Sequence, residues 1–367
     1  MRQLDEAAVE AACLGGGVYA SGGGGWFDHG MQNGLLAVRL GRPRLATIDE
    51  IPQEGVIVTI AAIGAPAAAD WEMQPRDYLR AFELIREAID EPIVGLMNGQ
   101  NGYSSTVNCW LPAALYDIPA IDVAGDTRAH PTIKLGAMGL AADPSFRTVQ
   151  TQAGGNRAQG AYLELVVKGN VFKTANILRR ASVESGGFIA SARLPLPVAY
   201  VRKHGALGAV SLALSVGEAM RAARDRGADA MIAAILRSAG GRILGKGVVQ
   251  KPELRTEGGF DHARYTITGD GDPFTVYTLN ELMAVDHGTQ RVATFPDVIA
   301  LLSLDTGLPL PVSHLRDGAN VALFQVPKSQ IPLSSSVKDP QAYPELEEIM
   351  GIELSRYAFA PFAEPQS

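Results

Sequence analysis

The stretch Ile118-Pro-Ala-Ile-Asp-Val-Ala-Gly-Asp-Thr-Arg-Ala-His-Pro131 contains a complete change from strand to loop. It begins as a short apolar run, which predicts a buried strand, and continues as a polar loop. Pro131 suits the first turn of a helix, which we expect to extend through Met138. A strand, a polar loop and a helix in this order are typical of α/β domains, in which such loops lie at the carboxyl edge of the sheet and bind ligands.

The polar loop holds four side chains that can carry chemistry: Asp122, Asp126, Arg128 and His130. We predict Asp126, His130 and Asp122 as catalytic residues that activate water, and the same three as ligands of a divalent metal such as zinc or manganese. As a base, His130 would have a pKa near neutrality without special tuning. Arg128 is predicted to bind a carboxylate of the substrate. The alternative is a structural loop in which Arg128 pairs with its neighbouring aspartates.

Further strand–loop–helix units precede this stretch. Apolar runs predict strands at residues 45–48, 56–61 and 93–97, and helical periodicity is expected at 31–40, 75–89 and 104–115. The loop after the third strand, 98–102, is rich in amides, which donate and accept hydrogen bonds without charge. We predict that Asn101 in this loop binds the substrate. Repeated units of this kind predict a mostly parallel α/β domain.

The N-terminal region has seven glycines among residues 15–25. We expect a helix over residues 4–14 that ends at the first three glycines, followed by a backbone that can approach a ligand closely. A phosphate-binding loop is disfavoured, because a helix rather than a strand precedes the glycines and no Gly-Lys-Ser/Thr follows. No nucleotide cofactor is therefore expected. A tight turn over a pocket, in which Gly23 and Gly24 bind the substrate through backbone groups, and a purely structural turn are the remaining alternatives.

The second half of the chain has a different pattern. Helices are predicted at 172–185, 210–226 and 228–239, and short strands separated by turns at 243–250, 262–268, 274–280, 298–304 and 321–326. This spacing suggests a β-rich sandwich or partial barrel. We therefore predict an α/β N-terminal domain with a mostly parallel sheet over 1–160, followed by a β-rich α+β C-terminal domain over 161–367.

Composition excludes several classes of partner. The 367 residues, 47% of them apolar, are enough for two cores, and the net charge of −7 without a basic run argues against nucleic-acid or membrane binding. Two cysteines without a Cys-x-x-Cys fit a reducing compartment. The acidic N-terminus does not resemble a signal peptide, and the longest apolar stretch, 56–69, is too short to span a membrane. We expect a cytoplasmic homo-oligomer with a small-molecule substrate.

Several short motifs, in this order, resemble the S-methyl-thiohydantoin desulfurase-domain proteins. The N-terminal motifs are Ser21-Gly-Gly-Gly-Gly25, Gly64-Ala-Pro66 with Glu72, and Arg128-Ala-His-Pro131. The C-terminal motifs are Gly245-Lys-Gly-Val-Val249, Gly258-Gly-Phe260, Asn280-Glu281, Asp286-His-Gly288, Pro296-Asp-Val-Ile299, Thr306-Gly307 and Leu315-Arg-Asp-Gly318. The resemblance covers roughly residues 4–350.

The resemblance implies a two-domain bacterial protein associated with hydantoinase- and oxoprolinase-type enzymes. It further implies hydrolytic attack on a ring carbon of a small cyclic amide or thioamide, and we include Asn280 among the substrate-binding residues. The chain departs from the family where a Glu is usual before Gly-Gly-x-Asn, since Leu96 stands there, and where an aromatic is usual, since His130 stands there. Three hypotheses follow: a hydrolase or desulfurase of hydantoin-like rings, a non-catalytic partner subunit of a hydantoinase-type enzyme, and a small-molecule binding protein.

Overall fold

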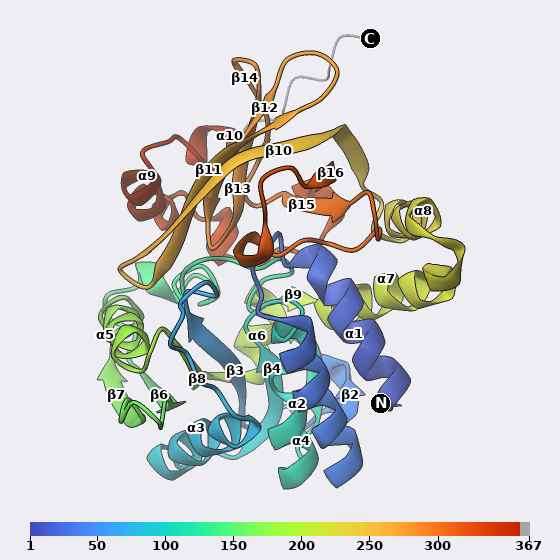
Figure 1. Cartoon of the computed structure of the whole chain (residues 1–367). Coiled ribbons are helices and arrows are strands. Elements are labelled where there is room, and N and C mark those ends of the chain that lie inside the picture. Colours follow the sequence, from blue (N-terminus) through green and yellow to red (C-terminus); the bar gives the residue numbers. More distant parts are fainter. Residues whose placement is uncertain (360–367) are drawn as a thin grey trace.

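The computed structural model describes residues 1–359, which form two lobes, each built on one sheet (Figure 1). The first sheet has the strand order β1-β2-β5-β4-β3-β8-β6-β7, with β9 paired to β5. Its strands are β1 (Arg2–Gln3), β2 (Arg44–Ala46), β3 (Val56–Gly64), β4 (Ile93–Asn98), β5 (Ala120–Ala124), β6 (Thr148–Gly154), β7 (Leu163–Gly169), β8 (Phe188–Pro197) and β9 (Ala206–Leu207).

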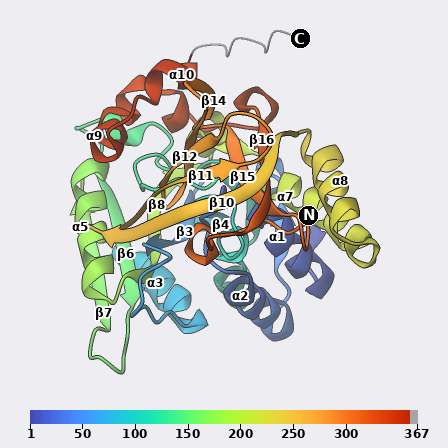
Figure 2. The same cartoon turned by 45° about the horizontal axis from the view of Figure 1, so that its top comes forward.

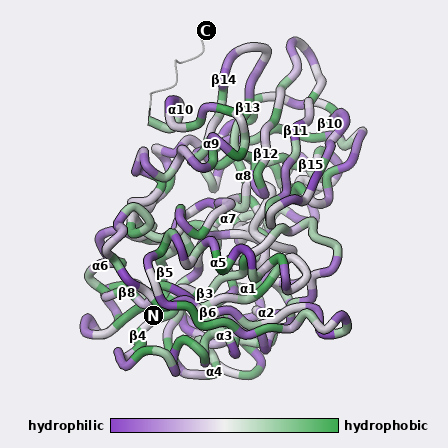
Figure 3. The backbone as a smooth tube through the Cα atoms, turned by 90° about the vertical axis from the view of Figure 1, so that its left-hand side faces the viewer, coloured by the Kyte–Doolittle hydropathy of each residue, from purple (hydrophilic) through white to green (hydrophobic). Residues whose placement is uncertain are grey.

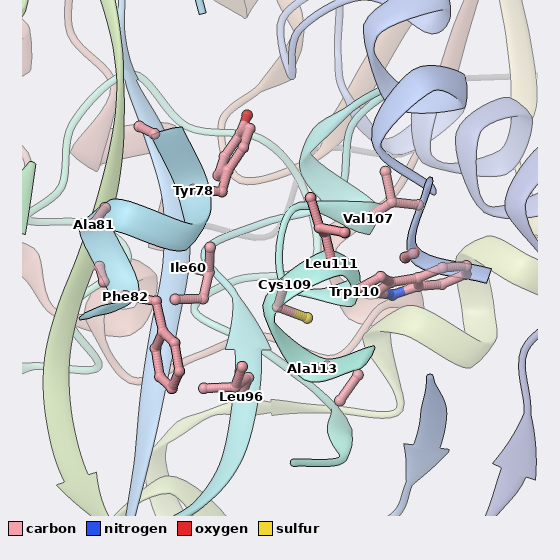
Figure 4. Packing of buried hydrophobic residues seen from close by; sticks show 14 of the residues in the cluster. Ile60, Tyr78, Ala81, Phe82, Leu96, Val107, Cys109, Trp110, Leu111 and Ala113 are labelled. Atoms are coloured by element: carbon pink, nitrogen blue, oxygen red, sulfur yellow. The ribbon is translucent and has the colours of Figure 1, made fainter. Parts of the chain in front are cut away.

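The centre of this sheet is parallel, because β2, β5, β4 and β3 all run in the same direction. Helices cover both faces, as a parallel sheet requires. The helices of the first lobe and of its junction with the second are α1 (Glu6–Tyr19), α2 (Phe27–Leu40), α3 (Pro75–Ala88), α4 (Trp110–Tyr116), α5 (Val171–Glu184), α6 (Val198–His204), α7 (Ala209–Ala223) and α8 (Ala228–Ala239). Figure 4 shows part of one cluster, in which Ile60 of β3 and Leu96 of β4 pack with Phe82 of α3 and Trp110 of α4.

The second lobe is a single curled antiparallel sheet with the order β14-β13-β12-β11-β10-β16-β15. Its strands are β10 (Arg242–Glu257), β11 (Phe260–Thr268), β12 (Phe274–Leu279), β13 (Glu281–His287), β14 (Gln290–Thr294), β15 (Val298–Ser303) and β16 (Asn320–Val326), and α9 (Pro344–Met350) and α10 (Ser355–Phe359) follow. In Figure 2 the long strand β10 crosses the molecule as a curved ribbon. The second sheet encloses its own apolar core, so it is a partial barrel and not a sandwich.

The predicted fold class is confirmed: an α/β lobe with a parallel centre is followed by a β-rich lobe. Viewed from the side, the second sheet lies above the first lobe (Figure 3). The division between the sheets falls between Leu207 and Arg242, because β7, β8 and β9 complete the first sheet. This division between the two sheets lies later in the chain than residue 160, where we predicted the domain boundary. The domain boundary itself stays a prediction.

The predicted end of the first helix at Gly15 is wrong, since α1 continues through the glycines to Tyr19. A Cβ on Gly15 would overlap the carbonyl oxygen of Ala213 and lie 2.7 Å from the backbone nitrogen of Gly217, both on α7. A Cβ on Gly217 would likewise overlap the carbonyl of Ala11. The glycines therefore permit close contact between two helices, and this packing outweighs their low helix propensity.

Two further predictions of local structure need correction. Residues 131–138 form successive turns and no helix, with backbone N–H groups bonded three residues back, as from Leu135 to Thr132 at 3.1 Å. Their apolar side chains, such as Leu135 and Met138, face the core, so packing and not periodicity decides this segment. Strand β8 was not predicted. It pairs antiparallel with both β3 and β6, which makes the sheet mixed.

Candidate functional site

A small cavity of about 40 Å³ lies between the two lobes, at the carboxyl ends of β3 and β4 and the start of β13. It is the region where an α/β sheet is expected to bind ligands. Its polar lining comes from both lobes and consists of Gln100, Ser105, His130, Thr132, Arg179, Arg193, Asn280 and Glu281. Ile63, Ile133 and Phe188 supply an apolar wall. A cavity in which polar groups from several segments converge beside an apolar wall is a candidate small-molecule site.

The glycine-rich loop forms one edge of this cavity through Gly24 and Gly25. Residues Ser21, Gly22, Gly24 and Gly25 all have positive φ, from 49° to 84°. The carbonyl of Ser21 accepts a hydrogen bond from Leu282 N at 2.7 Å, which ties the loop to the second lobe. A Cβ on Gly23 would overlap Oε1 of Glu281. Glycine at position 23 therefore makes room for this carboxyl group.

Glu281 is the acidic group of the cavity. Its side chain is 2% exposed, and Oε2 has no hydrogen-bond partner among the described residues. Burial raises the pKa of Glu281 from 4.5 to about 8, although Arg128 and Arg179 favour the ionised form. A carboxyl group with such a pKa can hold a proton at neutral pH and release it at slightly higher pH.

Asn280, the residue before Glu281, is held in a left-handed conformation with φ 57°. Its Oδ1 accepts a hydrogen bond from Asp261 N at 2.8 Å, and its N–H donates to Asp261 O at 2.7 Å. The carboxylate of Asp261 accepts a hydrogen bond from Ala67 N at 2.7 Å. These contacts fix the corner at which β13 enters the cavity and join it to the loop after β3.

His130 lines the cavity, as expected for a residue of the polar loop. The pKa of its imidazole, however, differs from the predicted one. Its backbone N–H donates to Oε1 of Gln100 at 3.1 Å, and both ring nitrogens lack a partner among residues 1–359. Burial and the charge of Arg193 lower the pKa of His130 to about 3. The imidazole is therefore neutral at physiological pH, and the predicted pKa near neutrality is corrected.

Other predicted residues serve packing or hydrogen bonding elsewhere. Oδ1 of Asp122 accepts from the backbone N–H groups of Val210 and Ser211, at 3.0 and 2.9 Å, and so caps α7. Nδ2 of Asn101 donates to Ala209 O at 2.9 Å. Neither residue lines the cavity.

Arg128 is fully buried and bonds to backbone carbonyls: Ala129 at 2.8 Å, Asp297 at 2.7 Å and Leu282 at 3.2 Å. It links the polar loop to the second lobe, and the predicted pairing with neighbouring aspartates is not seen. Because its guanidinium is already bonded to the protein, little of it remains for a substrate carboxylate.

The predicted metal ligands are not brought together. Asp122 caps a helix, and Asp126 is buried away from the cavity, where its Oδ1 accepts from Ser334 N at 3.0 Å. Burial raises the pKa of Asp126 to about 7. Within residues 1–359, no group of three or more His, Cys, Asp and Glu side chains is placed to hold a metal ion. The residues thus do not fit the expected metal site, and a role for a divalent metal stays a prediction.

Sequence reasoning missed Glu281 and Arg193 as site residues. Glu281 directly follows Asn280 in the motif Asn280-Glu281. The prediction of Asn280 as a substrate-binding residue was therefore the signal that could have identified Glu281. Arg193 lies in β8, the strand that was not predicted, within Phe188-Ile-Ala-Ser-Ala-Arg-Leu-Pro-Leu-Pro197. Two prolines and an arginine obscure the alternation that identifies a strand.

Comparison with known proteins agrees with the two-lobe architecture. The model of the S-Me-THD-like N-terminal domain matches residues 7–159, and that of the S-Me-THD-like C-terminal domain matches residues 169–335. The chain belongs to the S-methyl-thiohydantoin desulfurase-like family. In this family member, Leu96 is fully buried in the core and does not line the cavity.

The chain is also similar to a protein from Chromobacterium violaceum with a known crystal structure. The identity is 20%, the TM-score is 0.71, and 99% of each chain is covered, so the two share a fold. No curated protein matches the chain. Among the described residues, no helix combines the length and the hydropathy needed to cross a bilayer.

Proposed function

We propose that this family member is a hydrolase that removes sulfur from a small thiohydantoin-like ring by attack of an activated water. The observation that carries the proposal is the Glu281 carboxyl, buried in the cavity between the lobes, whose Oε2 has no hydrogen-bond partner among residues 1–359. The family membership supports the ring class. Both cysteines are fully buried and burial raises the pKa of each thiol, so neither offers a thiolate nucleophile.

The reaction would proceed in two steps at the ring carbon that carries the methylthio group. Ionised Glu281 accepts a proton from water while the water oxygen bonds to this carbon and the C=N electron pair moves to the ring nitrogen. The C–S bond then breaks as the new hydroxyl becomes a carbonyl, the hydroxyl proton passes to the ring nitrogen, and the proton on Glu281 passes to the departing sulfur. The products are a hydantoin and methanethiol, and Glu281 returns to its ionised form.

Neutral His130 and Gln100 would position the reactants. A neutral imidazole has one N–H donor and one acceptor nitrogen, so it can contact the water and a ring polar group together. Gln100 lines the same cavity, and its Oε1 accepts a hydrogen bond from the backbone N–H of His130. The apolar side chains of Ile63, Ile133 and Phe188 would exclude bulk water from the ring.

The test is an assay with hydantoin, thiohydantoin and S-methyl-thiohydantoin, which follows ring ultraviolet absorbance and the release of thiol. It is run with and without added zinc or manganese. Wild-type protein is expected to release methanethiol, and Glu281→Gln to lose at least about a hundredfold in rate. The control is Glu253→Gln, the same change at an exposed residue of β10. Absence of turnover on every ring, or a fully active Glu281→Gln, would contradict the proposal.

A second candidate function is that of a non-catalytic partner subunit of a hydantoinase-type enzyme. It is favoured by exposed apolar side chains on and beside the edge strand β7 and on α5, namely Tyr162, Val166, Phe172, Ile177 and Val183. Exposed apolar side chains can contribute to protein interfaces. A shift of a hydantoinase-type subunit on a sizing column, abolished by Val166→Lys and Ile177→Lys together, would support this function.

A further inference from the structure

Arg179 and Arg193 line the cavity together with Glu281, and the charge of Arg128 also acts on Glu281. The three arginines differ in their hydrogen-bond partners. Arg128 bonds to three backbone carbonyls, as described above. Arg179 of α5 also bonds to three: Gly64 O at 3.2 Å, Gly259 O at 2.9 Å and Pro131 O at 2.5 Å. Arg193 of β8 is only 3% exposed, and its Nε and Nη1 have no hydrogen-bond partner among residues 1–359. An arginine in this condition is unusual, because buried charges are normally paired.

The guanidinium of Arg193 reaches the cavity from the sheet. The residue is paired in register with Thr59 of β3 on one side and Gln150 of β6 on the other. A Cβ on Gly99 would lie 2.7 Å from its Nη2, and a Cβ on Gly136 would lie 2.8 Å from Nε2 of His130 and 3.5 Å from the same Nη2. Two glycines therefore leave space around the guanidinium, and Arg193 and His130 lie close to each other on the cavity wall.

Among residues 1–359, no carboxylate acts on the charge of Arg193. The ionisable group that acts on Arg193 is Arg179, which is another cation. The charges that favour ionisation of the Glu281 carboxyl are those of Arg128 and Arg179. His130 is neutral. Oγ1 of Thr59, Oγ of Ser191 and Oε1 of Gln150 also have no hydrogen-bond partner within residues 1–359, but these groups are neutral and cannot balance a cation. An anion is the kind of group that would balance this charge.

We propose that Arg193 is the binding group for an anionic substituent of the ligand, a carboxylate attached to the heterocyclic ring. This inference rests on the proposed function, because it concerns the same cavity, and it names the substrate class: ring derivatives of acidic character. A planar guanidinium with free N–H groups matches a carboxylate in a bidentate arrangement. Under this proposal Arg193, and not Arg128, binds the substrate carboxylate.

The experiment compares two ligands of the same shape, carboxymethylhydantoin and its neutral carboxamide, by titration calorimetry. Neither contains sulfur, so binding is measured without turnover, and a failure of the desulfurase proposal leaves this test intact. Wild-type protein is expected to bind the carboxylate at least about tenfold more tightly than the amide. Arg193→Met is expected to remove this preference, and Arg193→Lys to keep part of it because the charge remains.

The control and the stability of the variants separate binding from folding. Arg255→Met, at an exposed residue of β10, is expected to leave the preference unchanged. Arg193→Met is expected to melt at or above the wild-type temperature without ligand, because it removes a buried charge that nothing balances. Equal affinity of the wild-type protein for both ligands would overturn the proposal. So would an Arg193→Met variant that loses affinity for both ligands equally, or one whose melting temperature is far below that of the wild type.

Discussion

Replacing Glu281 by Gln removes a buried titratable group and should change how stability depends on pH. In the wild-type protein the pKa of Glu281 is raised from 4.5 to about 8, mainly by burial. Between these two values the folded state holds a proton that the unfolded state releases. Because the folded state binds more protons in this window, wild-type stability falls as the pH rises from about 4.5 to about 8 and then levels off.

The magnitude follows from the size of the shift. One pKa unit corresponds to about 1.4 kcal/mol, so a shift between 4.5 and about 8 corresponds to roughly 5 kcal/mol of stability lost across the window. Gln is close in shape to the protonated acid and has no titration, so Glu281→Gln should not show this loss. The difference in unfolding free energy between variant and wild type should therefore grow by up to about 5 kcal/mol from acid to alkaline pH.

The assay is urea unfolding of both proteins at about pH 5, 7 and 9. Other buried groups, such as Asp126 with its pKa of about 7, titrate in both proteins and largely cancel in the difference. Glu253→Gln, at an exposed position, should show a difference that hardly changes with pH. A difference for Glu281→Gln that is equally flat would refute the reasoning, since it would mean that the carboxyl of Glu281 is ionised in the folded protein at all three pH values.

Three other outcomes are expected. If Glu281 acts as the base in its ionised form, the desulfurase rate should rise with pH up to about 8 and then level, and a rate that falls over this range would contradict its role. Gly15→Ala should lower stability by about 1–3 kcal/mol by calorimetry, because its Cβ overlaps the backbone of α7; an increase of about 1 kcal/mol would instead indicate that helix propensity dominates. Asp122→Ala should lower the free energy of unfolding by about 1–2 kcal/mol through loss of the cap on α7. A lower reaction rate at unchanged stability would instead indicate that Asp122 is catalytic.

Much of the first sheet was predictable from residue patterns. The apolar runs that became β3, β4 and β5, and the helical period that became α3, survive in the structure because each is buried on the face that its pattern indicates. The turns at 131–138 were not predictable, since a proline after a polar loop suits a helix equally well. Their conformation depends on burial of Leu135 and Met138 against segments distant in the chain.

Some residues of the candidate site were likewise predictable from the sequence and others were not. His130, Gly24 and Asn280 line the cavity, since a loop at a strand end and a glycine turn carry local signals. Asp122 and Arg128 do not, although they looked equally suitable in the loop.

The sequence by itself determined the fold class, the family and the edge of the sheet at which chemistry is expected, because periodicity, turn residues and motif order are local properties. Only the tertiary structure decided which polar side chains are free. Arg128 and Arg193 are the same residue type, yet backbone carbonyls accept hydrogen bonds from the first, whereas Nε and Nη1 of the second have no partner among residues 1–359. Hydrogen-bond partners and desolvation come from residues far apart in the chain, and they set the state of Glu281, His130 and Arg193.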